Sequence, residues 1–141
     1  MKIHITENVN SAIQGFVLVP IVYGRLDLGG VTDNSATQII AIDAIDSVPS
    51  QMLVKFLQDI VSKMRIGCVA IFGGIELDIL ARGIVTKDVS SENFNNLVYS
   101  KKSLYRNSDI TNILTSLGLS IDNVLIQGIS YEITATRKNP N

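Results

Sequence analysis

The chain has 141 residues, of which 46% are hydrophobic and 18% charged, and its mean hydropathy is +0.29. This composition excludes a disordered chain, and the length suits a single domain spanning residues 1–141. Twelve basic and thirteen acidic residues give a net charge of −1, and no basic block occurs. Because binding to phosphates normally requires such a block, nucleic acid is an unlikely partner.

The chain offers little for disulfide, metal or membrane chemistry. The single cysteine, Cys68, cannot form an internal disulfide, and the single histidine, His4, cannot anchor a usual zinc site, so we expect no metal. The N-terminal segment lacks the long apolar core of a signal peptide. No apolar run approaches the roughly 18–20 residues that span a bilayer. We therefore expect a cytoplasmic protein without a membrane partner.

The first third of the chain predicts strands without a long helix between them. Alternating and β-branched residues predict a strand over 2–6, and a continuous apolar run predicts a second over 16–22. Pro20 lacks a donor, which places the second strand at or near an edge of the sheet. A short strand over 24–30 ends at a glycine pair, and turn chemistry follows at 32–35.

The middle of the chain predicts a strand–helix–strand unit. The apolar run at 38–45 predicts a central strand. Segment 50–65 has apolar residues at helical spacing, with Ser50 as N-cap and Gly67 in the C-cap region. A short buried strand over 68–72 follows. Such a unit is normally a parallel crossover, so 38–72 is expected to carry the core.

The last third predicts three helices and a hairpin. Helical spacing occurs over 76–84, over 90–100 after a serine cap, and over 108–117 before Gly118. Two alternating strands over 123–137 form the closing hairpin. The predicted fold class is α/β, a single domain with a mostly parallel, Rossmann-like sheet and an antiparallel C-terminal hairpin.

Residues 31–74 resemble the second half of a class I S-adenosylmethionine-dependent methyltransferase. The matching features are the turn Asp33-Asn34-Ser35, the strand Gln38–Ile45, Asp46-Ser47-Val48-Pro49, the 50–65 helix, Gly67 and the strand Cys68–Phe72. The terminal hairpin resembles the last two strands of that family. Segments ELDILARGIV and SSENFNNLVYS resemble small methyltransferase-like proteins predicted in phages and environmental sequences. The resemblance implies a cofactor site at the carboxyl ends of the first strands.

In such a fold the resemblance implies three contacts to the cofactor. A glycine-rich turn after the first strand admits it closely, an acid at the end of the second strand binds the ribose hydroxyls, and a polar group beyond the third strand contacts the adenine. Here residues 7–10 read ENVN, and Pro20 stands where the ribose acid is expected. Only the third contact has a match, at Asp27-Leu28. We expect weak or undetectable binding of S-adenosylmethionine.

Two functional hypotheses follow, and the sequence leaves both open. The first is a methyltransferase acting on a small-molecule or protein acceptor. Its cofactor site would be built from residues of three segments, namely Thr6, Glu7, Asn8 and Asn10 in place of the glycine turn, Asp27 and Leu28 at the adenine, and Asp43 and Asp46 toward the acceptor. The second is a catalytically inactive scaffold or binding subunit with the same fold. The alternative for these two acids is that Asp46 begins a turn into the 50–65 helix and that Asp43 faces a solvated crevice.

Two surface features concern the partners of the chain. The cluster Tyr99, Lys101, Lys102, Tyr105 and Arg106 could stack and bind a nucleic acid, but its small size favours a solvated loop. The missing helices near the N-terminus leave the apolar strand 16–22 uncovered. This predicts a homodimer that buries Phe16, Leu18 or Val22.

Overall fold

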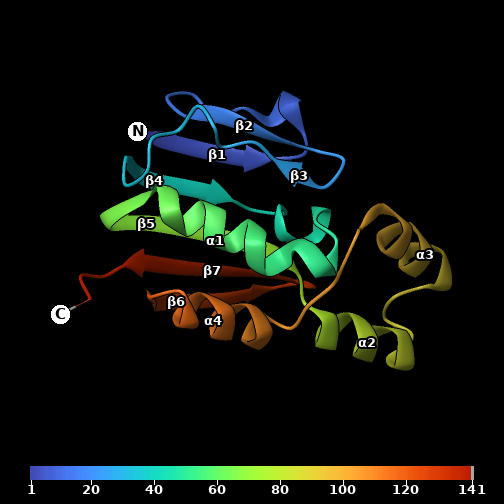
Figure 1. Ribbon diagram of the computed structural model, residues 1–141. Helices are drawn as coiled ribbons and strands as arrows, with labels where there is room; N and C mark the ends of the chain where they lie inside the picture. The colour runs from blue at the N-terminus through green and yellow to red at the C-terminus, as the bar shows by residue number, and fades with distance from the viewer. Residues whose placement is uncertain (141) are drawn as a thin grey trace.

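The computed structural model describes residues 1–140 and contains, within them, a seven-stranded sheet of order β3-β2-β1-β4-β5-β7-β6 (Figure 1). The strands are β1 Lys2–Thr6, β2 Val17–Val22, β3 Arg25–Leu26, β4 Ala36–Ala41, β5 Met64–Ile75, β6 Leu119–Gln127 and β7 Ser130–Arg137. Strands β2, β1, β4 and β5 run parallel, whereas β7 pairs antiparallel with both β5 and β6. The predicted mostly parallel α/β sheet with a closing hairpin is confirmed.

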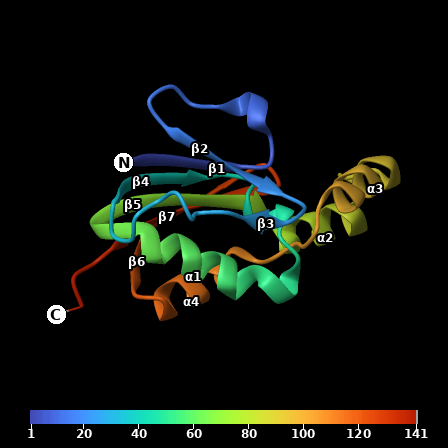
Figure 2. The ribbon, with the colours of Figure 1, turned by 45° about the horizontal axis from the view of Figure 1, so that its top comes forward.

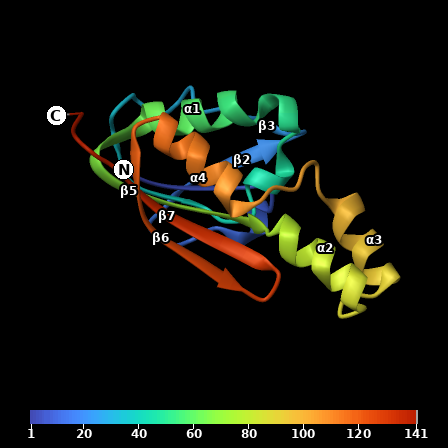
Figure 3. The ribbon, with the colours of Figure 1, turned by 90° about the horizontal axis from the view of Figure 1, so that it is seen from below.

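Two of the helices cover one face of this sheet. The α-helices of the described residues are α1 Leu53–Lys63, α2 Leu77–Thr86, α3 Ser91–Ser100 and α4 Asn107–Ser116. Helices α1 and α4 lie on the same side of the sheet, and α2 and α3 lie beyond its end (Figures 2 and 3). Within residues 1–140 no helix covers the opposite face. No helix of these residues has the length and apolar composition needed to cross a membrane.

The core lies between the sheet and helices α1 and α4. The face of α1 that the sequence predicts to be buried is buried, and none of its four apolar side chains is more than 4% exposed; they are Leu53, Phe56, Leu57 and Ile60. Helix α4 adds Ile110 and Leu114, which are fully buried. Complete burial of such a side chain contributes about 1.5–3 kcal/mol, so the 38–72 unit carries much of the stability.

The ends of α1 differ from the prediction. Ser50 begins a separate 3-10 turn, Ser50–Met52, and Met52 occupies the N-cap position without a side-chain hydrogen bond. Gly67 does not end the helix. The chain passes directly from Lys63 into β5, and Gly67, at φ +85°, lies inside that strand where its register with β4 shifts. A glycine in a left-handed conformation can interrupt a strand without ending it, which is why the sequence suggested too short a strand.

The connections near the N-terminus are short, as predicted. Between β1 and β2 the chain forms only the 3-10 turn Val9–Ser11, and between β2 and β3 only the two-residue turn Tyr23-Gly24. Both turn residues have positive φ, 52° and 72°, which is the geometry of a tight hairpin. Strand β3 pairs only with Ile21 and Val22, so β2 lies at the outer edge at Pro20, as expected.

Candidate functional site

A crevice lies at the carboxyl ends of β1 and β4. The chain leaves β1 toward β2 on one side of the sheet, and β4 pairs with β1 on the other side, so strand order reverses between them. Ligands of open α/β sheets bind at such a switch point. The crevice has a volume of about 620 Å³, within the range of small-molecule sites.

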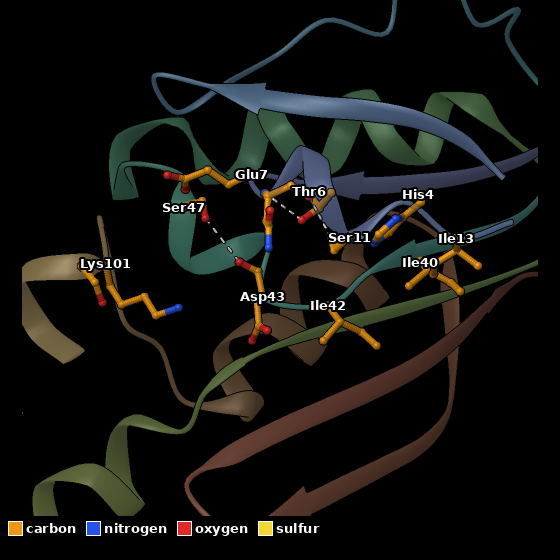
Figure 4. A pocket seen from close by; sticks show the side chains of 12 residues that line it. His4, Thr6, Glu7, Ser11, Ile13, Ile40, Ile42, Asp43, Ser47 and Lys101 are labelled. Atoms are coloured by element: carbon orange, nitrogen blue, oxygen red, sulfur yellow. Dashed lines mark hydrogen bonds between the residues drawn. The ribbon is translucent and has the colours of Figure 1, made fainter. Parts of the chain in front are cut away.

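The walls of the crevice come from three parts of the chain (Figure 4). Strand β1 and the loop after it, strand β4 and the turn after it, and the end of α3 contribute the lining residues, which are His4, Thr6, Glu7, Asn8, Ser11, Ile13, Ile40, Ile42, Asp43, Ser47, Ser100 and Lys101. Two carboxylates and one ammonium group thus border the same space. Figure 4 shows Lys101 extending from the wall formed by the end of α3 toward the wall that carries Asp43.

Backbone N–H groups of the loop after β1 form hydrogen bonds within the loop itself. The amide of Asn8 donates to Oγ1 of Thr6 at 3.0 Å, and the amide of Asn10 donates to Oδ1 of Asn8 at 3.1 Å. The amide of Ser11 donates to the carbonyl oxygen of Asn8 at 3.1 Å. These three N–H groups are therefore engaged within the loop and are not directed at a ligand.

Asp43 enters the crevice from a strained turn. Its φ is 61°, in the left-handed region that aspartate tolerates better than most residues. Ser47 Oγ donates to the Asp43 carbonyl oxygen at 3.3 Å and closes the turn toward the 3-10 segment Ile45–Ser47. The conformation holds the Asp43 carboxylate at the exposed end of β4.

His4 is the most enclosed polar residue that lines the crevice. Its side chain projects from the middle of β1 and is 6% exposed. Within residues 1–140 its Nδ1 atom has no hydrogen-bond partner. Burial lowers the pKa of His4 below its ordinary value, which favours the neutral imidazole at neutral pH. The ring therefore offers an unused polar atom beside the crevice.

Behind the crevice, Asp46 lies in a buried polar cluster. It is fully buried, and its Oδ2 atom accepts a hydrogen bond from the amide of Ile75 at 2.8 Å. Within the described residues Oδ1 of Asp46 and the hydroxyl of Tyr131 have no partner. Burial raises the pKa of Asp46 to about 6, although the Ile75 hydrogen bond and Lys101 oppose the shift. Burial also raises the pKa of Tyr131.

Comparison with models of known protein families and with curated protein sequences gives no match. Solved structures do match. A SAM-dependent methyltransferase from Archaeoglobus fulgidus aligns with a TM-score of 0.65 at 11% identity, over 96% of this chain and 85% of that protein. This chain has the fold of the class I S-adenosylmethionine-dependent methyltransferases.

Larger methyltransferases show the same similarity. A structure from Thermotoga maritima, titled as a possible histamine N-methyltransferase, aligns with a TM-score of 0.60 at 14% identity. Magnesium protoporphyrin IX methyltransferase from Synechocystis PCC 6803, with bound SAH, aligns with a TM-score of 0.56 at 13% identity. The alignments cover 88% and 92% of this chain but only 65% and 55% of those proteins. At these identities the match describes the fold alone.

The methyltransferase fold brings together half of the residues predicted for the cofactor site. Four of them line the crevice: Thr6, Glu7, Asn8 and Asp43. The other four do not line it: Asn10, Asp27, Leu28 and Asp46. Leu28 and Asp46 are buried, and Asp27 lies in a separate depression beside β2 and β3. The role of all eight in cofactor binding stays a prediction.

Sequence reasoning missed the contributions of His4 and Lys101. His4 read as a structural residue in the middle of a strand, but the absence of a helix after β1 leaves its face of the sheet open to the crevice. Lys101 belonged to a cluster interpreted as a solvated loop. The position of Lys101 directly after α3 is the signal that could have identified it. The segment between α3 and α4 must return across the carboxyl ends of the strands, which brings Lys101 to the crevice.

Proposed function

We propose that this chain is a methyltransferase-fold binding subunit whose crevice takes a small polar ligand, with S-adenosylmethionine bound weakly or not at all. The observation that carries the proposal is the loop after β1, in which the backbone donors of Asn8, Asn10 and Ser11 are engaged internally. A cofactor that depends on free amides at this loop would have to break those hydrogen bonds first.

The end of β2 also lacks a contact suited to a ribose. Strand β2 turns back through Tyr23-Gly24 into β3, and no residue of β2 lines the crevice. The nearest acid in sequence, Asp27, accepts a hydrogen bond from the amide of Gly29 at 2.9 Å. Neither the loop after β1 nor the end of β2 therefore fits the cofactor.

The charges in the crevice indicate the kind of ligand it would accept. Glu7 and Asp43 supply two carboxylates, whereas Lys101 supplies one ammonium group. The hydroxyls of Ser11 and Ser47 and the neutral ring of His4 add hydrogen-bonding groups. Since the carboxylates outnumber the cation, the lining best fits a small polar molecule that carries a positively charged group and needs neither free amides in the loop after β1 nor a ribose contact from β2.

Calorimetric titration with S-adenosylmethionine tests the proposal. A hydrogen bond to a charged group contributes about 1.5–3 kcal/mol, so the loss of a bidentate ribose contact weakens binding by roughly 3–6 kcal/mol. At about 1.4 kcal/mol per tenfold, a micromolar dissociation constant rises by roughly two to four decades, to about 0.1–10 mM. We expect no heat at micromolar ligand. A dissociation constant in the low micromolar range would show that the crevice is a working cofactor site.

An active methyltransferase is the second candidate, and the position of the crevice at the β1/β4 switch point favours it. Glu7 would then bind the ribose hydroxyls in place of the acid that the family resemblance expects at the end of β2, and from a different direction. Thermal shift with S-adenosylhomocysteine separates the two candidates, because a ligand that binds only the native state raises the melting temperature. Asp43→Asn should abolish the shift if the crevice is the site, whereas Asp27→Asn, outside the crevice, should leave it unchanged.

A further inference from the structure

Strand β6 forms an exposed edge of the sheet. Its outer six residues, 122–127, are all exposed, and three successive apolar side chains among them are 37%, 47% and 42% exposed: Val124, Leu125 and Ile126. Figure 3 shows the β6–β7 hairpin projecting past α4, which contacts the beginning of β6. Residues 119–127 contain no lysine, arginine or proline, the residues that commonly protect an edge from pairing.

We infer that β6 is a self-pairing edge, at which two copies of this chain form an antiparallel β6–β6 ladder about a two-fold axis. Such an axis is perpendicular to the sheet and keeps each side chain on its own face. The ladder must therefore be centred on a residue that pairs with itself. Among the possible centres, the side chains of β6 favour one.

Centring on Leu125 makes the strand complementary to itself. Leu125 then pairs with Leu125 of the second copy, Val124 with Ile126, and Asn123 with Gln127. Apolar groups meet apolar groups, and amides meet amides. The regular part of β6 available to the ladder is residues 123–127, between the register shift at Asp122 and the turn at Gly128, so Asp122, the single charged residue of β6, faces no like charge. Centring on Val124 would instead place Asn123 opposite Leu125 and Asp122 opposite Ile126.

The opposite edge of the sheet limits the assembly to two copies. Within residues 1–140 that edge consists of β3, which has only two residues, Arg25–Leu26, and of residues 17–20 of β2, which β3 does not pair with. Neither part offers a long uninterrupted row of backbone groups to a β6 ladder, because β3 is short and Pro20 lacks an N–H donor. Head-to-tail growth of the sheet is therefore disfavoured, and pairing of β6 with β6 gives a dimer rather than a filament.

Light scattering during gel filtration at high micromolar concentration gives the first test. We expect the wild-type chain to elute as a dimer. Leu125→Lys places two ammonium groups opposite each other and should weaken dimerisation by at least about tenfold. Val85→Lys, at a residue of α2 that is 81% exposed, is the matched control and should remain dimeric. Circular dichroism confirms that both variants fold. A monomeric wild type, or a dimer unaffected by Leu125→Lys, would overturn the proposal.

A cysteine at the two-fold position gives an independent test. Directly opposed residues of an antiparallel pair have Cα atoms about 4.5–5.5 Å apart, which a disulfide can bridge. Cys68 is buried, so Leu125→Cys introduces an exposed thiol with no competing one in the described chain. Mild oxidation should convert most of this variant, but little of Val85→Cys, into a covalent dimer. Equal cross-linking of both would refute the ladder. Dissociation by Leu18→Lys instead of Leu125→Lys would place the interface on the uncovered face of β2 and also refute it.

Discussion

Replacing Asp46 with asparagine should stabilise the folded chain at neutral pH but not in acid. The Asp46 carboxyl is fully buried, and its pKa rises from 3.8 to about 6 on folding. Below about pH 4 the Asp46 carboxyl is protonated in both the folded and the unfolded chain, so it does not make the free energy of unfolding depend on pH. Between about pH 4 and pH 6 the unfolded chain releases the proton while the folded chain keeps it. The free energy of unfolding therefore falls as pH rises through this window.

The magnitude follows from the pKa difference. A shift of one unit corresponds to about 1.4 kcal/mol, so a rise from 3.8 to about 6 lowers the free energy of unfolding by about 3 kcal/mol above pH 6. Asparagine remains neutral at every pH. Its side-chain oxygen can still accept the hydrogen bond from the amide of Ile75, and its NH2 group adds a donor toward the unpaired hydroxyl of Tyr131.

Urea unfolding of the wild-type chain and of Asp46→Asn from pH 4 to pH 8 measures this change in the free energy of unfolding. We expect equal free energies of unfolding near pH 4 and a difference in favour of Asp46→Asn that grows to about 3 kcal/mol by pH 7. Asp43→Asn, at an exposed carboxylate, is the control and should show no such growth. A difference that is constant across the range, or that favours wild type above pH 6, would refute the reasoning about the buried carboxyl.

Three further substitutions test local parts of the structure by urea unfolding. Asp43→Ala should destabilise by about 1 kcal/mol more than Asp43→Gly, because alanine does not tolerate the positive φ of this turn; equal losses would contradict the strained turn. Gly74→Ala should destabilise the fold by about 1–3 kcal/mol, since the added Cβ would lie 2.7 Å from the buried Oδ1 atom of Asp46. Gly30→Ala is the control and should leave the stability unchanged, because a Cβ there has no atom within 4 Å. Arg137→Ala should destabilise the fold by about 1–3 kcal/mol, because the Arg137 guanidinium donates to two carbonyl oxygens at the end of α1. Lys138→Ala is the control, and an equal loss of stability there would contradict a specific role of the Arg137 hydrogen bonds.

The helix-covered half of the fold could be predicted because its sequence pattern is local. The apolar spacing of segment 50–65 is explained by one buried helical face, and the flanking apolar runs are explained by parallel strands. The exact limits of these elements could not be predicted. Gly67 reads as a helix end, but its positive φ is accommodated within β5, and only the pairing with β4 shows this.

The candidate site was predictable only where position along a strand determines it. Thr6 is the last residue of β1 and Asp43 follows β4, the parallel neighbour of β1, so both residues lie at the same edge of the sheet and line the crevice. The family resemblance predicts Asp27 at the adenine, and Asp46 is predicted at the site because it follows the same strand as Asp43. A local hydrogen bond to Gly29 engages Asp27, and packing against β5 buries Asp46. Such competing partners are set by tertiary structure and leave no periodic signal in the sequence.

The two faces of the same strands separate the residues that stabilise the fold from those that border the crevice. Successive side chains of a strand point to opposite faces, so Ile3 and Ile39 pack under the helices while His4 and Ile40 border the crevice. The buried set supplies the apolar area that stabilises the sheet, and the crevice set contributes little to it. Substitutions in the crevice can therefore change what the chain binds without unfolding it. For this reason a similarity in fold at 11–14% identity leaves the ligand open, and binding must be measured at the crevice itself.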